Sequence, residues 1–325
     1  MKKLLLILLC VPLMIVAQQT YEPKSNGELV QHNYYSLSYI EEHEQAEWVY
    51  YKLTSEMING TYERTDNFRS DPDVSTFSAG KSDYYKTGYD RGHLAPAADM
   101  KISEKAMLES FYMSNMSPQN PSFNRGGWKS LESLVRSWVL TEGEMYVVTG
   151  AIFSNILERI GQSNVTVPGY YYKIIYSKEN NKMIGLIMPN EKTTNDLNYY
   201  VQSVDSIETL TGIDFFYQID DETENKLEAN KNDQNWSFNI VSKITSKNNS
   251  ISSAQCKGIA KSTSKRCRNK TKNENGYCYV HKSQSPDYVP PKKSDYVGRC
   301  TAKTKKGSQC KRNSSNGKRY CWQHQ

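Results

Sequence analysis

Residues suited to acid–base chemistry lie in one part of this chain, and residues suited to metal binding lie in another. The first part centres on His93, in the stretch YDRGHLAPAADM (89–100). A neutral imidazole with a pKa near its usual value is a good general base at neutral pH; a histidine that only completes a turn is the alternative. The second part lies beyond residue 255, where six of the seven cysteines and two of the five histidines occur. The chain therefore combines one candidate base with a separate thiol-rich region.

The thiol-rich region is an internal repeat. Its first copy separates three cysteines and a histidine by ten, ten and two residues, and its second copy by nine, ten and two. The members are Cys256, Cys267, Cys278 and His281 in the first copy, and Cys300, Cys310, Cys321 and His324 in the second. Three thiolates and one imidazole make a complete tetrahedral set for Zn²⁺, which we predict in both copies. Disulfides are the alternative, although three cysteines per copy would then have to pair between copies and the histidines would have no role.

The charge of the chain changes at the same place. Residues 256–325 hold eighteen Lys or Arg and three Asp or Glu, a net charge of +15, so the total of +6 leaves −9 for residues 1–255. Dense positive charge favours contacts with the phosphate backbone of DNA or RNA, and such contacts do not depend on base sequence. A solvated surface that keeps a small module soluble is the alternative. We predict a basic, nucleic-acid-binding tail on an acidic body.

The N-terminus has the features of an export signal. Two lysines precede an apolar run from Leu4 to Val16, and Ala17 is a small residue suited to cleavage before Gln18. The run is too short for a stable membrane span. We therefore predict that residues 1–17 are removed on export to the periplasm or the medium, without stable membrane association; an uncleaved anchor is the alternative. The sequence leaves the oligomeric state open.

Motifs downstream of His93 complete a pattern. The DRGH tetrapeptide (90–93) is followed about twenty residues later by SNMSPQ (114–119) and then by NRGGWKSLE (124–132). This ordered set resembles the DNA/RNA non-specific endonucleases of the ββα-metal class, the secreted bacterial nuclease and endonuclease G type. The similarity spans roughly residues 45–220. It implies a metal-dependent endonuclease that hydrolyses phosphodiester bonds in DNA and RNA and leaves 5′-phosphates.

The residues fit that chemistry. Hydrolysis of a phosphodiester needs a base for water, a cation for the leaving oxygen and positive charge near the non-bridging oxygens. The resemblance gives His93 the role of base and Asn124 that of the single protein ligand of Mg²⁺, with Mn²⁺ as an alternative ion. Mg²⁺ prefers oxygen ligands and keeps most of its waters, so one carbonyl oxygen is sufficient.

Glu132 receives a supporting role near the metal-bound waters from the same resemblance, and an ordinary surface glutamate is the alternative. On a straight helix Glu132 would lie about 12 Å beyond Asn124, at ~1.5 Å per residue. Both residues therefore cannot bind one ion directly on such a helix. We expect Glu132 to act through water or by fixing a neighbour such as Arg91.

Three further residues are expected at the site by resemblance. Arg91, from DRGH, is expected to contact the phosphate. The family also has an upstream arginine, for which ERTDNFRSDP (63–72) offers Arg64 and Arg69; we choose Arg69. Asn115 matches a position near the metal, and an asparagine that braces the loop is the alternative.

The elements expected around these residues are mixed strands and helices. Apolar runs, some of them alternating, predict strands at 48–54, 145–153, 170–177 and 182–190. Apolar periodicity and capping residues predict helices at 103–116, 126–140 and 194–211. No regular strand–helix alternation is present, so the fold class is α+β. The resemblance implies a ββα-metal nuclease fold with a central mixed or antiparallel sheet and flanking helices, plus two small zinc-knuckle-like C-terminal modules.

The resulting organisation has seven parts. They are a signal peptide (1–17), an N-terminal lead-in (18–44), an endonuclease domain (45–245), a linker (246–255), the first Cys/His repeat (256–282), a linker (283–299) and the second repeat (300–325). The lead-in contains His32 and His43, which are expected to be exposed. A non-catalytic nucleic-acid-binding protein on a nuclease-like scaffold is the competing hypothesis; it is disfavoured because the chain keeps both the base and the metal ligand.

Overall fold

A computed structural model of the chain describes residues 20–240 and, beyond them, 254–261, 263–271, 273, 275–286, 288, 300 and 309–310. The expected signal peptide lies outside the described residues, as do Cys321 and His324. Within the described residues no helix has the length and apolar character that a membrane crossing needs.

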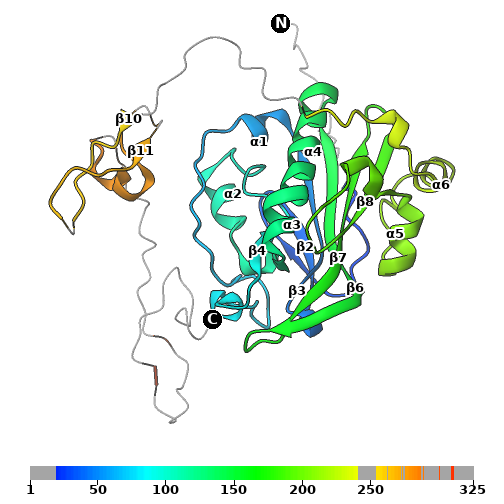
Figure 1. Cartoon of the computed structure of the whole chain (residues 1–325), viewed down its shortest axis with the longest axis horizontal. Coiled ribbons are helices and arrows are strands. Elements are labelled where there is room, and N and C mark those ends of the chain that lie inside the picture. The colour runs from blue at the N-terminus through cyan, green and yellow to red at the C-terminus, as the bar shows by residue number, and fades with distance from the viewer. Residues whose placement is uncertain are drawn as a thin grey trace, which may run out of the picture.

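Seven strands form one antiparallel sheet in the body (Figure 1). Their order across the sheet is β1-β2-β3-β6-β7-β8-β9. The bounds are β1 Glu28–Gln31, β2 Ser36–Ile40, β3 Gln45–Leu53, β6 Met145–Ile160, β7 Val165–Ser177, β8 Lys182–Pro189 and β9 Val201–Gln202. The four predicted strands are confirmed within β3, β6, β7 and β8, and the lead-in contributes β1 and β2. Every pairing between neighbouring strands of this sheet is antiparallel, so the fold is α+β with an antiparallel rather than a mixed sheet.

Helices cover both faces of this sheet. Along β3, Val49, Tyr51 and Leu53 belong to one buried cluster with α4 (Lys129–Glu142), whereas Trp48 and Tyr50 belong to the opposite cluster. That second cluster includes residues of α5 (Val204–Thr211) and α6 (Asp221–Glu228). The alternation follows from the period of two in a strand, which sends successive side chains to opposite faces. Figure 1 shows α4 on one side of the sheet and α5 and α6 on the other.

A smaller hairpin and a broken helix carry the DRGH and NRGGW motifs. Strand β4 (Asp90–His93) pairs with β5 (Met116–Gln119), and β5 is followed by α3 (Pro121–Phe123), a π-helical turn (Asn124–Trp128) and then α4. The predicted helix at 126–140 is confirmed in α4. Its apolar stripe is buried as expected: Trp128, Leu131, Leu134, Val135, Trp138 and Val139. The hairpin and the broken helix together form a ββα unit.

The other two predicted helices are shorter than expected. Ser103 caps α2 (Glu104–Glu109) by accepting a hydrogen bond from the Ala106 backbone N–H, but the helix then ends because the chain turns through a 3₁₀ segment (Met113–Asn115) into β5. The segment 194–211 divides into a 3₁₀ turn (Leu197–Tyr200), β9 and α5, because Val201 pairs with Leu186 of β8. In both cases tertiary pairing overrides the local helical pattern.

The remaining elements are short. They are α1 (Ser55–Asn59), 3₁₀ turns at Glu41–His43, Lys81–Tyr84, Asp233–Asn235 and Tyr279–Gln284, and a two-stranded sheet of β10 (Ala254–Gln255) and β11 (Lys270–Thr271). Strand β11 lies in the first Cys/His repeat, β10 pairs with it from the end of the expected linker, and the last 3₁₀ turn continues past residue 282. Figure 1 shows these elements apart from the seven-stranded sheet.

Candidate active site

His93 is placed by the register of the β4–β5 pair. It lies opposite Met116, and Gly92 lies opposite Ser117. A Cβ atom on Gly92 would lie 2.1 Å from Cδ of Gln119, so only glycine lets this side chain cross the strand pair. The glycine of DRGH is therefore a requirement of close packing beside the histidine. DRGH is a strand, so His93 is not a turn residue.

The imidazole of His93 is buried in an aromatic pocket. The ring centroid of Phe111 lies 5.0 Å away in an edge-to-face arrangement, and that of Phe68 lies 5.8 Å away. The Nε2 atom has no hydrogen-bond partner among the described residues. Burial is the main cause that lowers the pKa of His93, and together with the positive charges of Arg64 and Arg91 it brings the value to about 3. The imidazole is therefore neutral at physiological pH, as a general base must be before it accepts a proton.

Two arginines approach His93 across the same aromatic rings. The guanidinium of Arg91 lies over Phe68, 4.3 Å from the ring centroid, and that of Arg64 lies over Phe111, 5.0 Å from the centroid. Arg64 is also held by Asp66, with 2.7 Å between Nε and Oδ1. Both arginines thus place positive charge where an anionic phosphate would approach the base.

Arg69, our choice from the sequence for the upstream arginine, does not join this group. Its guanidinium lies 4.2 Å from the ring centroid of Tyr112, and Nη1 donates a 3.2 Å hydrogen bond to the carbonyl oxygen of Asn67. The backbone of Arg69 also pairs with that of Tyr112, which directs the side chain along Tyr112 instead of toward His93. Arg64, the other arginine in the motif, is the one that lies near His93.

Asn124 is oriented by a neighbouring carboxylate. Its Nδ2 donates to Oδ2 of Asp90 at 2.9 Å, and Arg125 donates to both oxygens of the same carboxylate at 2.8 and 2.6 Å. The amide nitrogen is thereby occupied, and the structure shows no hydrogen bond to Oδ1 among the described residues. A fixed, neutral carbonyl oxygen beside a carboxylate suits Mg²⁺, which binds through few protein oxygens and its own waters. The residues present therefore fit the expected ion.

The helix between Asn124 and Glu132 is not straight. Gly126 has φ −106° and ψ −109°, outside the helical region, so the chain bends between the two residues. The expected separation of about 12 Å along one axis, at ~1.5 Å per residue, does not apply to this bent segment. At the bend Gly127 packs against Thr193, whose Oγ1 would lie 2.0 Å from a Cβ at that position.

Glu132 is partly buried and belongs to a charged cluster with the buried Lys173 and Asp99, so it is not an ordinary surface glutamate. Burial raises the pKa of Glu132, and the charges of Lys173 and Arg136 oppose that shift. Burial also lowers the pKa of Lys173, and Glu132 opposes the change. Arg136 pairs with Asp99 at 2.8 Å. Each charge in the cluster thus depends on the others for compensation.

Lys173 itself was missed from the sequence. It is fully buried on β7, donates to Thr149, and its Nζ lies 5.0 Å from the ring centroid of Trp128. The available signal was a lone lysine inside the apolar run YYYKIIYS (170–177). A buried lysine in such a run indicates a nearby carboxylate.

Asn115 braces the loop after His93. It is fully buried, accepts a hydrogen bond from the Ala95 N–H at 2.8 Å, and donates to the carbonyl oxygens of Ala95 and Ser110, both at 2.9 Å. Both ends of its amide are therefore engaged in holding backbone. The structure supports the bracing alternative over a contact with the metal.

The expectation that His32 and His43 are exposed is wrong. The His32 side chain is 1% exposed, and its Nε2 lies 2.8 Å from Oδ2 of the buried Asp71. His43 stacks on Phe153 at 3.9 Å and bonds Thr166 at 3.0 Å. Their polar sequence surroundings gave no sign of these partners, because each partner comes from a distant segment.

The first Cys/His repeat is brought together as predicted. Its four ligand atoms lie within 4.8 Å of one another. In the second repeat Cys300 and Cys310 are buried against each other, and Cys321 and His324 lie outside the described residues.

The chain matches a known protein family. A family model described as DNA/RNA non-specific endonuclease matches residues 16–222. The chain belongs to this family. The family is one of nucleases, so the protein is a hydrolase of nucleic acids.

Several nucleases of this family are similar in sequence or structure. A nuclease of Nostoc sp. is 35% identical over 61% of this chain and 76% of its own length. Human mitochondrial endonuclease G is 33% identical over 56% of this chain and 67% of its own. A crystal structure of the EndoG/EndoGI complex contains a chain that superposes with a TM-score of 0.56 at 31% identity, covering 61% of this chain and 89% of that one. The family model thus covers most of the body and ends before the Cys/His repeats.

Proposed function

We propose that this member of the non-specific endonuclease family is an exported enzyme that depends on Mg²⁺ or Mn²⁺ and cuts both DNA and RNA. The observation that carries the proposal is the pocket of His93: a buried, neutral imidazole whose Nε2 has no hydrogen-bond partner in the part of the chain that the structure describes, approached by Arg64 and Arg91. The Cys/His repeats enter the proposal as zinc-binding modules.

Attack by water on phosphorus needs a group that takes the water proton. His93 Nε2 accepts that proton while the water oxygen bonds to phosphorus and the P–O3′ bond breaks. The products are a 5′-phosphate and a 3′-hydroxyl, whose proton comes from solvent. Arg64 and Arg91 donate to the non-bridging oxygens, where negative charge develops.

The metal would be held by Asn124 through Oδ1, with Asp90 and Arg125 fixing the amide. Bound there, the ion supplies positive charge for the departing 3′ oxygen and orients the phosphate. The Asp90 carboxylate, beside the amide, is positioned to accept hydrogen bonds from the waters around the ion.

The low pKa of His93 is tuned by the substrate itself. With the pocket empty, two positive charges and burial make the imidazole a weak base. A phosphate that pairs with Arg64 and Arg91 cancels their effect, and a nearby anion favours the protonated form. Substrate binding therefore raises the pKa of His93 and strengthens the base at the moment it is needed.

Cleavage of plasmid DNA and of single-stranded RNA in Mg²⁺ tests the proposal. His93→Ala is expected to slow both reactions by roughly 10²–10⁴-fold, the usual contribution of a general base. His43→Ala is the matched control, since it removes a partly buried histidine away from the pocket and is expected to leave the rate within a few fold. Full activity of His93→Ala would refute the mechanism, and tight binding without cleavage by the unaltered protein would revive a non-catalytic role.

The two upstream arginines offer a matched pair. Arg64→Ala is expected to lower kcat/KM by about 10²-fold because charge-assisted contacts to a transition state are lost. Arg69→Ala is expected to change it little, since Arg69 lies along Tyr112. Equal losses in both variants would contradict the assignment.

Product ends and export have separate tests. New 5′ ends should accept label from a polynucleotide kinase only after phosphatase treatment, and direct labelling would show a 5′-hydroxyl instead. Mature protein recovered from the periplasm or the medium is expected to begin at Gln18, and recovery of a chain that retains Met1 would argue against removal of a signal peptide.

A further inference from the structure

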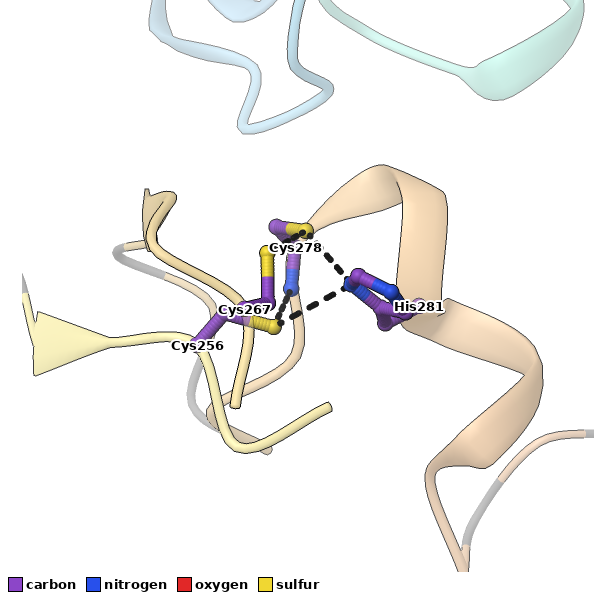
Figure 2. A group of neighbouring side chains, drawn as sticks. All are labelled: Cys256, Cys267, Cys278 and His281. Carbon is purple, nitrogen blue, oxygen red and sulfur yellow. Dashed lines mark hydrogen bonds between the residues drawn. The ribbon is translucent and has the colours of Figure 1, made fainter. Parts of the chain in front are cut away.

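The first Cys/His repeat brings four ligand atoms together at its centre. Figure 2 shows the side chains of Cys256, Cys267, Cys278 and His281 pointing toward one another from separate parts of the segment. All four are buried, with exposed fractions of 0, 6, 2 and 6%. No disulfide joins the three cysteines, which are free thiols. A small segment thus places its reactive groups inside and keeps them close without bonding them.

The distances match the edges of a zinc tetrahedron. Zinc–sulfur bonds of about 2.3 Å and a zinc–nitrogen bond of about 2.0 Å imply edges of about 3.8 Å between sulfurs and about 3.5 Å between sulfur and nitrogen. Nδ1 of His281 lies 3.7 Å from Sγ of Cys256 and 3.4 Å from Sγ of Cys278. The sulfurs of Cys267 and Cys278 are 4.0 Å apart. A disulfide would need about 2.05 Å between two sulfurs.

Backbone groups around the sulfurs support thiolate ligands. The N–H groups of Gly258 and Cys278 donate to Sγ of Cys256 at 3.3 and 3.2 Å, and that of Asn269 donates to Sγ of Cys267 at 3.4 Å. Such donors stabilise a metal-bound thiolate and fix its direction. Gly258 also lets His281 approach, because a Cβ at position 258 would lie 2.3 Å from Cβ of His281.

Apart from its hydrogen bonds, the described part of this segment has little regular structure and little apolar packing. Its sheet consists of β10 and β11 with two residues each, and the buried cluster found within it consists of the three cysteines. Four protein ligands leave no open position, so the site is suited to structure and not to catalysis. Metal binding is then the main source of folding free energy for the segment.

The outer surface of the segment is basic. Residues 256–282 contain eight Lys or Arg and one Asp or Glu. The exposed cations among the described residues are Lys257, Lys261, Lys265, Arg266, Arg268, Lys270 and Lys282. Lys265 and Arg268 flank Cys267, so a metal-bound Cys267 would hold both near one place. A fixed group of cations is suited to a phosphate backbone.

We propose that Cys256, Cys267, Cys278 and His281 bind one Zn²⁺, and that this ion folds a basic module that holds the nucleic-acid backbone for the nuclease body. The first half stands on the geometry of the segment alone. The second half rests on the proposed function, because a body that cuts nucleic acid and carries net negative charge of its own gains from a separate basic contact with the same chain.

Zinc content of the full-length protein tests the first half. Cys267→Ser and His281→Gln are each expected to lose one equivalent of zinc, measured by mass spectrometry of the metal, while Thr263→Ala in the same loop retains it. Cobalt substitution should give thiolate-to-cobalt absorption that Cys267→Ser weakens. Unchanged zinc content in both ligand variants would overturn the proposal, as would disulfides found at these cysteines in the non-reduced protein.

Affinity for uncut DNA tests the second half. In the His93→Ala background, so that binding is measured without turnover, replacing Lys265 and Arg268 together by Ala is expected to reduce the slope of log K against log salt by about 2. Lys226→Ala with Lys231→Ala makes the same charge change on exposed lysines of the body and should reduce it less. An unchanged slope for the first pair, or binding to phosphatidylserine vesicles but not to DNA, would overturn the nucleic-acid role. Cleavage by His93→Ala itself would instead refute the proposed mechanism and leave this binding result standing.

Discussion

The body and the first Cys/His repeat represent two ways of fixing polar side chains in space. In the body, strand register and apolar packing on both faces of a seven-stranded sheet hold the site, so His93 keeps its position by being buried among Phe68 and Phe111. In the repeat, two strands of two residues each cannot provide such a frame. There the Cys and His side chains would themselves hold the segment together by binding one metal ion.

The two regions are therefore expected to respond differently to loss of metal. The body is expected to keep its structure without an ion, because Asp90 already holds the amide of Asn124. The repeat has no large apolar core to keep its structure in the same way. Its cysteines face inward, and as thiolates they would repel one another unless a cation neutralised their charge.

Removal of both metals is expected to give the largest difference between the two regions in protection from hydrogen exchange. With a chelator, cleavage is expected to stop and residues 256–282 to lose protection from hydrogen exchange, because structural zinc contributes roughly 10–16 kcal/mol of apparent binding free energy. Residues 20–240 are expected to keep theirs. Hydrogen exchange read by mass spectrometry measures both. Loss of protection across the body as well would show that the regions do not fold independently.

Lys173→Met tests how far the body depends on its own charged cluster. The variant removes the buried Lys173 cation and leaves the partly buried Glu132 without it, at an expected cost of up to about 3–5 kcal/mol in the free energy of unfolding. Adding Glu132→Gln to it should recover part of that loss. Lys178→Met, at an exposed lysine just beyond β7, is the control. Urea unfolding measures all of these, and a neutral Lys173→Met would contradict the interdependence of the cluster.

The decrease in the free energy of unfolding at acid pH depends on the pKa of His93 in its pocket. The pKa of His93 falls from 6.5 to about 3 on folding, so below pH 6.5 the unfolded chain binds a proton that the folded chain does not. The free energy of unfolding should therefore fall by ~1.4 kcal/mol per pH unit as pH drops from 6.5 toward 3. His93→Gln removes this contribution, and its unfolding curves between pH 4 and 7 should be flatter. Parallel pH profiles for the two proteins would rule out a buried, neutral imidazole.

The smallest effect is expected where the two regions touch. Lys282 of the repeat pairs with Glu104 of α2, and both side chains are about half exposed. An exposed ion pair is worth about 0–1 kcal/mol. Lys282→Ala should therefore change neither the melting of the body nor the zinc content measurably. A shift of several degrees in the melting temperature of the body would indicate a real interface.

Much of the site was readable from residue types in order. DRGH, Asn124 and Glu132 pointed to a base, a metal ligand and a supporting carboxylate, and the structure brings His93 and Asn124 into one ββα unit. The repeat was easier to predict, because the spacing of its three cysteines and one histidine already indicates which side chains form one ligand set. The strands were found because buried runs and alternation are local properties of the chain.

What could not be read depends on contacts between distant segments. Arg64 was passed over for Arg69 because nothing local says which arginine reaches the ring of Phe111. His32 was expected at the surface, yet Asp71, 39 residues away, buries and binds it. The bend at Gly126 between Asn124 and Glu132 has no local signal that separates it from a straight helix, and the next residue, Gly127, packs against the distant Thr193.

Residue types and their spacing alone give the chemical inventory of this protein: one candidate base, one amide for a metal, and two sets of thiols at matching intervals. The electrostatics of these groups arise only in the folded structure. A pKa near 3 for His93 arises from burial and from two arginines that approach across aromatic rings, and the charged cluster of Glu132 and Lys173 arises from β7 packing under α4. Covalent spacing sets which groups are available, whereas the dielectric and the charges around each group depend on segments that meet only after folding.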